Sequence, residues 1–242
     1  MGIESNLIIS LLKLTKNGSV SNELVKKDSG VATSICQRLL EKLQTENLLN
    51  LQKGNLTVNG AQRVKLAVYA IASGADLENT ASFLQWKEFE DMASTALERN
   101  GFSVAENVRF KNQGKRWEID VVGCKKPLVV CVDCKHWHRG MAPSALKRIV
   151  EEQEERTLAF SKHLPSPSLR IECATWTTAK FIPAVLSLVA GRFKFYDDVP
   201  IVPVLQLQDF LNQLPAYANS LKHFSKGTAT LKLDHDFSQR LL

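Results

Sequence analysis

Two apolar stretches of this 242-residue chain carry charged side chains at positions where a buried strand is expected. The first, RWEIDVVG, contains Asp120, and the second, VVCVDCKHW, contains Asp133 and Lys135. Successive side chains of a strand point to opposite faces, so Asp133 and Lys135 should share one face. Charges in such apolar surroundings are costly for structure alone, which favours a chemical role.

The chemistry that these groups support is hydrolysis of a phosphate ester. Carboxylates suit Mg²⁺, which usually keeps waters and substrate phosphates among its ligands. A metal of this kind polarises the phosphate and lowers the pKa of a bound water, while a lysine positions that water or stabilises developing negative charge. Asp120 and Asp133 are therefore candidate metal ligands, and Lys135 is a candidate catalytic residue.

The second stretch also offers a possible zinc site made of Cys131, Cys134, His136 and His138. Strand alternation argues against it, because Cys131 and Cys134 should face opposite sides of the sheet. Structural zinc sites usually join two ligand pairs, and the sequence contains no second Cys-x2-Cys pair. The two cysteines are better interpreted as small buried hydrophobic residues.

The surrounding apolar pattern predicts the elements that position these residues. WKEFEDMASTALERNGFSV is amphipathic and ends at Asn100-Gly101, which indicates a helix that leads into a strand. The next strand-like runs are 102–110, 116–123 and 128–136. The turn between the second and third runs is short, so they should pair as a hairpin and bring Asp120 beside Asp133 and Lys135.

The rest of the sequence predicts alternating helices and strands. The expected order is a helix, a strand, a helix, a strand and a final helix, at 144–164, 168–176, 181–191, 199–207 and 209–221. Together with the preceding elements, this order indicates an α/β fold in which a mixed sheet is flanked by helices.

The first 75 residues show a different pattern. Three amphipathic helices precede LLNLQKGNLTVNG, in which two short strands flank Lys53-Gly54-Asn55. This order is typical of a winged helix-turn-helix domain, which most often places its third helix in the DNA major groove. Candidate DNA contacts on that helix are Gln37, Arg38 and Lys42. Winged helices also bind proteins, so that possibility stays open. GADLEN suggests a boundary between domains at 1–75 and 76–242.

Positive charge favours an anionic partner. The formal net charge is +6 at pH 7. The segment RFKNQGKR contains no acidic residue, which predicts a rim that contacts phosphates through Arg109, Lys111, Lys115 and Arg116. Further candidates for phosphate contact or base stacking close the third strand, namely His136, His138 and Arg139.

Asp120, followed after a twelve-residue gap by Asp133-Cys134-Lys135, resembles the motif of the PD-(D/E)XK nuclease superfamily, whose fold is restriction-endonuclease-like. The helix that carries Phe89-Glu90 is similar to one found in Mrr-type restriction endonucleases and archaeal Holliday-junction resolvases. The resemblance implies that Glu90 is a further metal or water ligand and that Gln153, on the helix after the motif, is a catalytic-site residue. Glu118, two positions before Asp120, stays open as an alternative ligand.

The resemblance implies a Mg²⁺- or Mn²⁺-dependent DNA endonuclease, active as a homodimer, that hydrolyses phosphodiester bonds in DNA repair, recombination or restriction. The alternative is a non-catalytic winged-helix DNA-binding or assembly protein with a nuclease-like dimerisation domain. The N-terminus lacks a signal-peptide pattern, no apolar run has transmembrane length, and the cysteine number is odd. These features favour a cytoplasmic location.

Overall fold

The structure is a computed structural model, and it describes residues 2–135, 143–166 and 168–226. His136, His138 and Arg139, three of the candidate nucleic-acid contacts, lie outside the described residues. None of the helices within those ranges combines the length and the apolar character needed to cross a bilayer.

The first part of the chain packs helices against a small antiparallel sheet. Its elements in chain order are α1 (Ile3–Leu14), β1 (Val20–Ser21), α2 (Asn22–Ser29), α3 (Thr33–Thr45), β2 (Asn50–Gln52) and β3 (Asn55–Thr57). The sheet has the order β1-β3-β2. The sequence predicted a hairpin around Lys53-Gly54-Asn55, and the hairpin is present. Its turn is formed by Lys53 and Gly54, which both have positive φ, whereas Asn55 begins β3.

Two helices, α4 (Gly60–Ala72) and α5 (Leu77–Ser82), connect this part to the rest of the chain. α4 begins with a capping box, because the Asn59 side chain accepts from the Gln62 amide while the Gln62 side chain accepts from the Asn59 amide. Asp76 caps α5 by accepting a hydrogen bond from the Asn79 amide. Local sequence therefore determines where each connecting helix begins.

The second part is a mixed sheet with helices on both faces, which confirms the predicted fold class. Its helices are α6 (Trp86–Arg99), α7 (Pro143–His163) and α8 (Leu207–Tyr217). Its strands are β4 (Ser103–Asn112), β5 (Lys115–Lys125), β6 (Leu128–Cys134), β7 (Ala179–Ser187), β8 (Phe195–Tyr196), β9 (Val199–Pro203) and β10 (Phe224–Lys226). The strand order is β4-β5-β6-β7-β9-β8, and β10 pairs with β7. β4, β5 and β6 are antiparallel, whereas β6, β7 and β9 are parallel.

The two faces of the sheet are covered by different helices. α6 and α8 contribute Leu97 and Leu211 to one core, which includes Val132 of β6. α7 contributes Phe160 to a second core, which includes Cys131 of the same strand. Adjacent residues of β6 thus enter different cores, as the alternation of a strand requires.

Two of the predicted elements are wrong. Residues 181–191 were expected to be helical, but they belong largely to the buried strand β7 and the segment that follows it. A strand covered on both faces is apolar at every position, so its sequence lacks the alternation that distinguishes strand from helix. Residues 168–176 were expected to form a strand, but only a short 3-10 helix at Glu172–Thr175 occurs there.

The two parts of the chain share one hydrophobic core. Leu11 of α1, Leu66 of α4 and Leu97 of α6 all belong to it. A buried ion pair crosses the same junction, where Arg63 Nε lies 2.6 Å from Glu88 Oε1. The Arg63 guanidinium also donates to the carbonyl oxygens of Leu12 and Phe83. Removing either partner would leave an uncompensated buried charge, so Arg63 and Glu88 depend on each other at this junction.

α6 approaches β5 very closely at Gly123. A Cβ atom at this position would lie 2.6 Å from Cδ2 of Leu97, well inside van der Waals contact. A Cβ atom there would force the buried Leu97 side chain to shift, so glycine permits this close approach of α6 to β5.

We predict that Gly123→Ala destabilises the protein by about 1 to 3 kcal/mol, because the added methyl group overpacks the α6–β5 contact. Urea unfolding would measure this as a lower midpoint at unchanged slope. Gly60→Ala is the matched control, since its nearest atom would be at an ordinary 3.4 Å. Equal stability of the two variants would contradict the packing argument.

Candidate active site

β5 and β6 separate from each other at two aspartates. Their pairing ends at Val121 and Val132, so the next opposed positions are Asp120 and Asp133. There the Cys134 amide donates a hydrogen bond to Oδ2 of Asp120 at 2.7 Å. This bond to a side chain takes the place of a backbone hydrogen bond between β5 and β6. β5 continues beside β4 while β6 continues beside β7, so the two carboxylates lie where the sheet opens.

Asp133 is almost completely buried, with 2% of its surface exposed, and two cations flank its carboxylate. Arg156 donates to Oδ1 at 2.6 Å, and the Lys135 ammonium lies 3.1 Å from Oδ2. Among the described residues, Oδ2 has no hydrogen-bond partner. Asp133 and Lys135 therefore lie close together, as expected. Oδ2 of Asp133 can still accept a hydrogen bond or bind a cation.

Gln153 is fully buried on α7 and links this carboxylate to the sheet. Its Nε2 donates to the Cys131 carbonyl oxygen at 2.7 Å, and its Oε1 accepts from Arg156 at 2.9 Å. The resemblance placed Gln153 in the site, and the geometry gives it a positioning role, because it orients Arg156 toward Asp133.

Arg156 was not among the residues selected from the sequence. Its position three residues after Gln153 places the two side chains on one face of α7, and this helical spacing is the signal that could have identified it. It contributes a second positive charge to the Asp133 carboxylate, at a shorter distance than Lys135.

The pKa of Asp120 is well above the ordinary value for an aspartate. Burial raises its pKa to about 6, and repulsion from Asp133 adds to the increase. The Cys134 amide and the charges of Lys135 and Arg156 oppose the increase without cancelling it. Two carboxylates near each other with one raised pKa are a common arrangement at catalytic and metal-binding sites.

Glu90 lies on the α6 side of the sheet and is held by other residues. It is buried, with Lys87 at 3.8 Å, and Lys87 also contacts Glu106 at 2.5 Å. Burial raises the pKa of Glu90, and repulsion from Glu106 contributes. Glu90, Asp120 and Asp133 all raise the pKa of the Cys134 thiol, whose burial is the main cause. Glu90 thus acts electrostatically on the same strand end without joining the pair of aspartates.

Within the described residues, no three His, Cys, Asp or Glu side chains lie close enough together to hold a metal ion. The expected set of Asp120, Asp133 and Glu90 is therefore not assembled, because Asp133 faces α7 whereas Glu90 is held on α6. The two aspartates alone fit Mg²⁺, which often takes one or two carboxylates and completes its shell with water and phosphate. Oδ2 of Asp133 accepts no hydrogen bond from the described residues and has only the ion pair with Lys135 at 3.1 Å among the contacts described, which supports this fit.

The cysteines of the motif lie on opposite faces of β6. Cys131 belongs to the core under α7 and Cys134 to the core under α6. Both are buried and free, as are the other cysteines of the chain, at positions 36, 124 and 173. This separation agrees with the interpretation of Cys131 and Cys134 as core residues.

β5 changes face at Asp120. Ile119 and Val121 are two positions apart, yet they belong to different cores. Asn107 of β4, which flanks this point, has a φ of 50°, a conformation that is uncommon for a residue other than glycine. Glu118 and Asp120 therefore do not share a face as simple alternation predicts. Glu118 instead forms two hydrogen bonds with Arg109, each 3.1 Å long.

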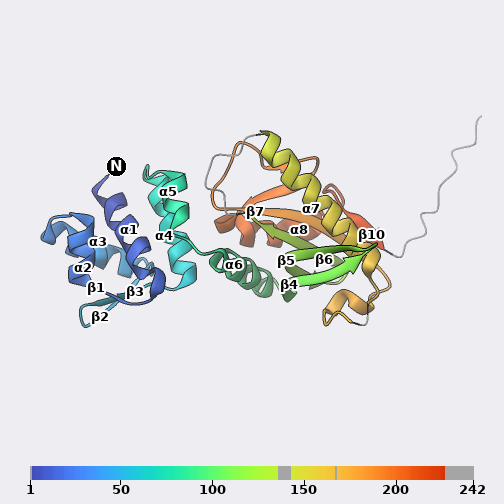
Figure 1. The fold of residues 1–242 in the computed structure, drawn as a ribbon, viewed down its shortest axis with the longest axis horizontal. Coiled ribbons are helices and arrows are strands. Elements are labelled where there is room, and N and C mark those ends of the chain that lie inside the picture. Colours follow the sequence, from blue (N-terminus) through green and yellow to red (C-terminus); the bar gives the residue numbers. More distant parts are fainter. Residues whose placement is uncertain (1, 136–142, 167, 227–242) are drawn as a thin grey trace, which may run out of the picture.

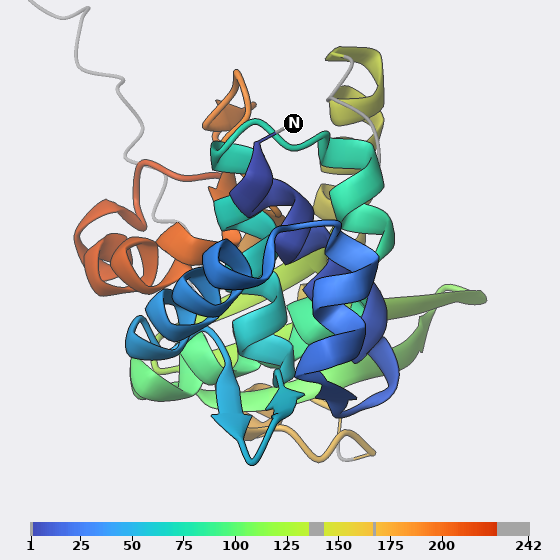
Figure 2. The same ribbon diagram turned by 90° about the vertical axis from the view of Figure 1, so that its left-hand side faces the viewer.

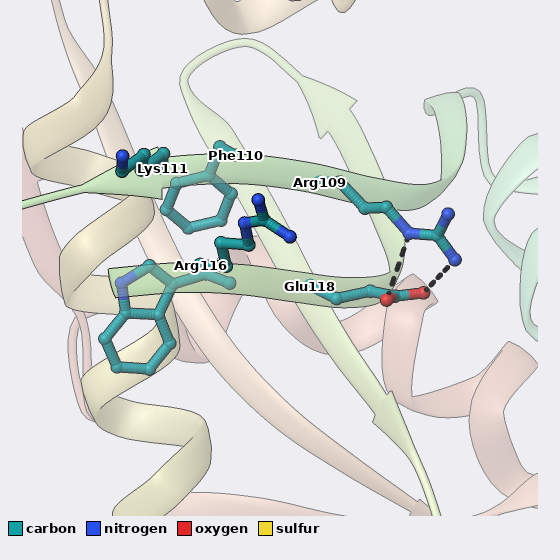
Figure 3. Close-up of a pocket in the computed structure, with 6 residues that line it drawn as sticks. Arg109, Phe110, Lys111, Arg116 and Glu118 are labelled. Atoms are coloured by element: carbon teal, nitrogen blue, oxygen red, sulfur yellow. Dashed lines mark hydrogen bonds and ion pairs between the residues drawn. The ribbon is translucent and has the colours of Figure 1, made fainter. Parts of the chain in front are cut away.

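The β4–β5 hairpin carries the predicted basic rim, and Figure 3 shows the concavity of about 550 Å³ on it. The side chains that line this concavity are Arg109, Phe110, Lys111, Arg116, Trp117 and Glu118. Lys115 lies 3.7 Å above the Trp117 ring and 3.6 Å from Glu155. A neighbouring concavity extends from Lys115 and Arg116 to Arg156 on α7, so the rim adjoins the residues that hold Asp133.

The three candidate DNA contacts on α3 differ in whether their side chains are already engaged within the molecule. Lys42 is paired with Glu4 at 2.9 Å and donates to the Tyr69 hydroxyl at 2.8 Å. Gln37 donates to Glu41, whereas Arg38 is exposed. Arg38 therefore has the side chain most accessible to a partner of these three candidates.

We predict that Asp120→Asn stabilises the metal-free protein above pH 6. Because the folded-state pKa is about 6 and the ordinary value is 3.8, the unfolded chain releases its proton first, and stability falls as pH rises between these values. Asparagine cannot ionise and avoids this loss, which is on the order of 2 to 3 kcal/mol. Urea unfolding in EDTA from pH 3.5 to 8 would test this. Parallel curves for variant and wild type would contradict it.

Comparison with known proteins relates part of this chain to a known family. Residues 81–159, which include α6, the two aspartates and Gln153, match a family model described as restriction endonuclease. An uncharacterized protein of Archaeoglobus fulgidus is 30% identical over 135 residues, which cover 55% of this chain and 95% of the relative.

Two solved structures are also similar. Protein AF1548, of unknown function, shares 18% identity over 40% of this chain and 45% of its own, with a TM-score of 0.27. Protein VC1899 from Vibrio cholerae shares 15% identity over 89% of this chain and 50% of its own, with a TM-score of 0.37. The chain thus spans about half the length of both. From the family match and the relative that it covers almost completely, the chain belongs to the restriction-endonuclease-like superfamily, with a nuclease-like domain that includes residues 81–159.

Proposed function

We propose that this protein is a divalent-metal-dependent endonuclease that hydrolyses phosphodiester bonds of DNA. The observation that carries the proposal is the meeting of Asp120, Asp133 and Lys135 at the point where β5 and β6 separate. A buried carboxylate, a half-buried carboxylate and a lysine at an opening in a sheet are costly to maintain for stability alone. They supply the charges that phosphodiester hydrolysis needs.

Asp120 and Asp133 would hold Mg²⁺ or Mn²⁺, which when bound lowers the pKa of a water and offsets charge on the phosphate. Lys135 would orient the attacking water or stabilise charge that develops on the phosphate oxygens. Gln153 and Arg156 would keep the Asp133 carboxylate in its orientation through their own hydrogen bonds. Glu90 would act from the α6 side, as a base or as a ligand reached through water.

The first 75 residues are proposed to form a winged helix-turn-helix domain, with residues 76–242 as the nuclease domain. The order of helices and the β2–β3 hairpin support this assignment. In that domain α3 would contact DNA through Arg38, which is exposed. A homodimer is the proposed assembly, because two equivalent sites would cut the two strands of a duplex.

We predict that the full-length protein cleaves DNA in Mg²⁺ or Mn²⁺ and that Asp133→Asn or Lys135→Met reduces the rate by about 100-fold or more, because each removes a charge that acts on the reacting phosphate. Plasmid, branched and single-stranded DNA are the substrates to compare. Glu151→Gln is the matched control, since this exposed carboxylate of α7 pairs with Lys147 at 3.7 Å.

Equal cleavage by wild type and both variants would contradict the assignment of these residues. The competing function is a non-catalytic DNA-binding or assembly protein. Tight binding of DNA by the wild type in EDTA, with no cleavage of any substrate in either metal, would favour that function.

Metal binding is predicted to be measurable without cleavage. Mg²⁺ or Mn²⁺ at about 100 times its dissociation constant should stabilise the wild type by about 2.7 kcal/mol, because it binds the folded chain alone. Thermal unfolding should show this shift for the wild type and a much smaller one for Asp133→Asn. A shift of the same size in Asp133→Asn would exclude Asp133 as a ligand.

A further inference from the structure

The two faces of the β4–β5 hairpin have different chemical character, and the hairpin register defines them. Arg109 is directly opposite Glu118, and Lys111 is directly opposite Arg116. Directly opposed residues of antiparallel strands share a face. We call this the outer face of the hairpin, with the residues Arg109, Lys111, Arg116 and Glu118. Figure 2 shows the green ribbon of the hairpin extending to one side of the molecule.

The opposite face of the hairpin is used for packing. Phe110 lies 5.3 Å from the Phe160 ring of α7, measured between centroids, and it pairs in register with Trp117. Lys115 covers the Trp117 ring and reaches toward Glu155 of α7. The charge of Lys115 is therefore paired within the molecule, unlike the charges of Lys111 and Arg116 in the part of the chain that the structure describes.

The outer face carries three cations and one anion. Arg109 is neutralised by Glu118 through two hydrogen bonds. Lys111 and Arg116 are exposed and directly opposed, and neither has an ion pair within the part of the chain that the structure describes. Like charges at opposed positions destabilise a hairpin, so this pair has no structural benefit of its own. It is the kind of arrangement expected where an anion is bound.

We propose that the outer face binds the phosphate backbone of duplex DNA and so sets how the duplex approaches the paired aspartates. The proposal rests on the proposed function, which makes DNA the substrate. Arginine and lysine contacts to phosphate fix the position of a duplex without reading its sequence. A concavity between the hairpin and α7 is lined by Arg116 and Glu118 and by Arg156, which donates to Asp133. Its other lining residues are Lys115, Trp117, Glu152 and Glu155.

The duplex form is favoured by the position of the aromatic residues. Proteins that bind single strands stack bases on aromatic side chains. Phe110 and Trp117 line the concavity on the hairpin, but Phe110 is buried against Phe160 and Lys115 covers the Trp117 ring, so neither ring is available for a base to stack on. A two-stranded ribbon also has dimensions that fit the major groove.

The test compares Lys111→Gln/Arg116→Gln with the wild type in EDTA, using fluorescence anisotropy with a 30-base-pair duplex and the matching single strand. We expect at least tenfold weaker duplex binding near 0.1 M salt. The slope of log affinity against log salt should fall by about 2, since each lost phosphate contact lowers it by about 0.9. Lys147→Gln/Arg148→Gln also removes two charges, but from pairs on α7, and should keep the wild-type slope.

An unchanged duplex slope in the hairpin variant would overturn the proposal. A loss of single-strand affinity as large as the loss of duplex affinity would overturn its assignment to duplex DNA. The variant should fold with an equal or higher melting temperature, because repulsion is removed. If it folds poorly, the single variants should each lower the slope by about 1. Binding in EDTA needs no cleavage, so failure of the catalytic proposal would leave this result intact, and the reverse also holds.

Discussion

Repulsion between Asp120 and Asp133 is the constraint on which the arrangement of the site depends. The end of the β5–β6 pairing places the two carboxylates side by side in a largely buried region, where neither can be fully solvated. Arg156, Lys135 and the Cys134 amide offset this repulsion, yet burial and the remaining repulsion together keep the pKa of Asp120 raised. The helices that pack on the two faces of the sheet keep the two carboxylates at this unfavourable proximity.

Those layers act from both sides of the sheet. On one side, α7 inserts the fully buried Gln153, which bonds to the backbone of β6 and directs Arg156. On the other side, α6 is fixed by the close approach at Gly123 and brings Glu90 into electrostatic range of the same strand end. The positions of the acidic groups therefore follow from helix packing as much as from the strands.

The sequence predicted well those features that depend on neighbours along the chain. The β5–β6 hairpin, the shared face of Asp133 and Lys135 and the separation of Cys131 from Cys134 all follow from short turns and strand alternation. The strand β7 was missed because burial on both faces removes alternation. The sequence did not predict that Glu118 and Asp120 lie on different faces, because no local pattern indicates that β5 changes face at Asp120.

Long-range partners were also beyond local reasoning. The pairing of Lys42 with Glu4 joins positions far apart in the chain, and so does the contact between Arg156 and Asp133. Strand alternation predicts the face on which a side chain lies, but it does not predict which residue from another element will contact that side chain. The identity of a site can thus be read from its own residues, whereas the balance of charge within it depends on the tertiary fold.

The buried pair of Arg63 and Glu88 has a mechanical consequence. Because it lies in a core shared by α1, α4 and α6, no flexible tether separates the first part of the chain from the sheet. The shared core limits how far the separation between α3 and the paired aspartates can change. A partner bound by α3 would then be held at a defined distance from the strand end, which would set a spacing along any rigid polymer that contacts both.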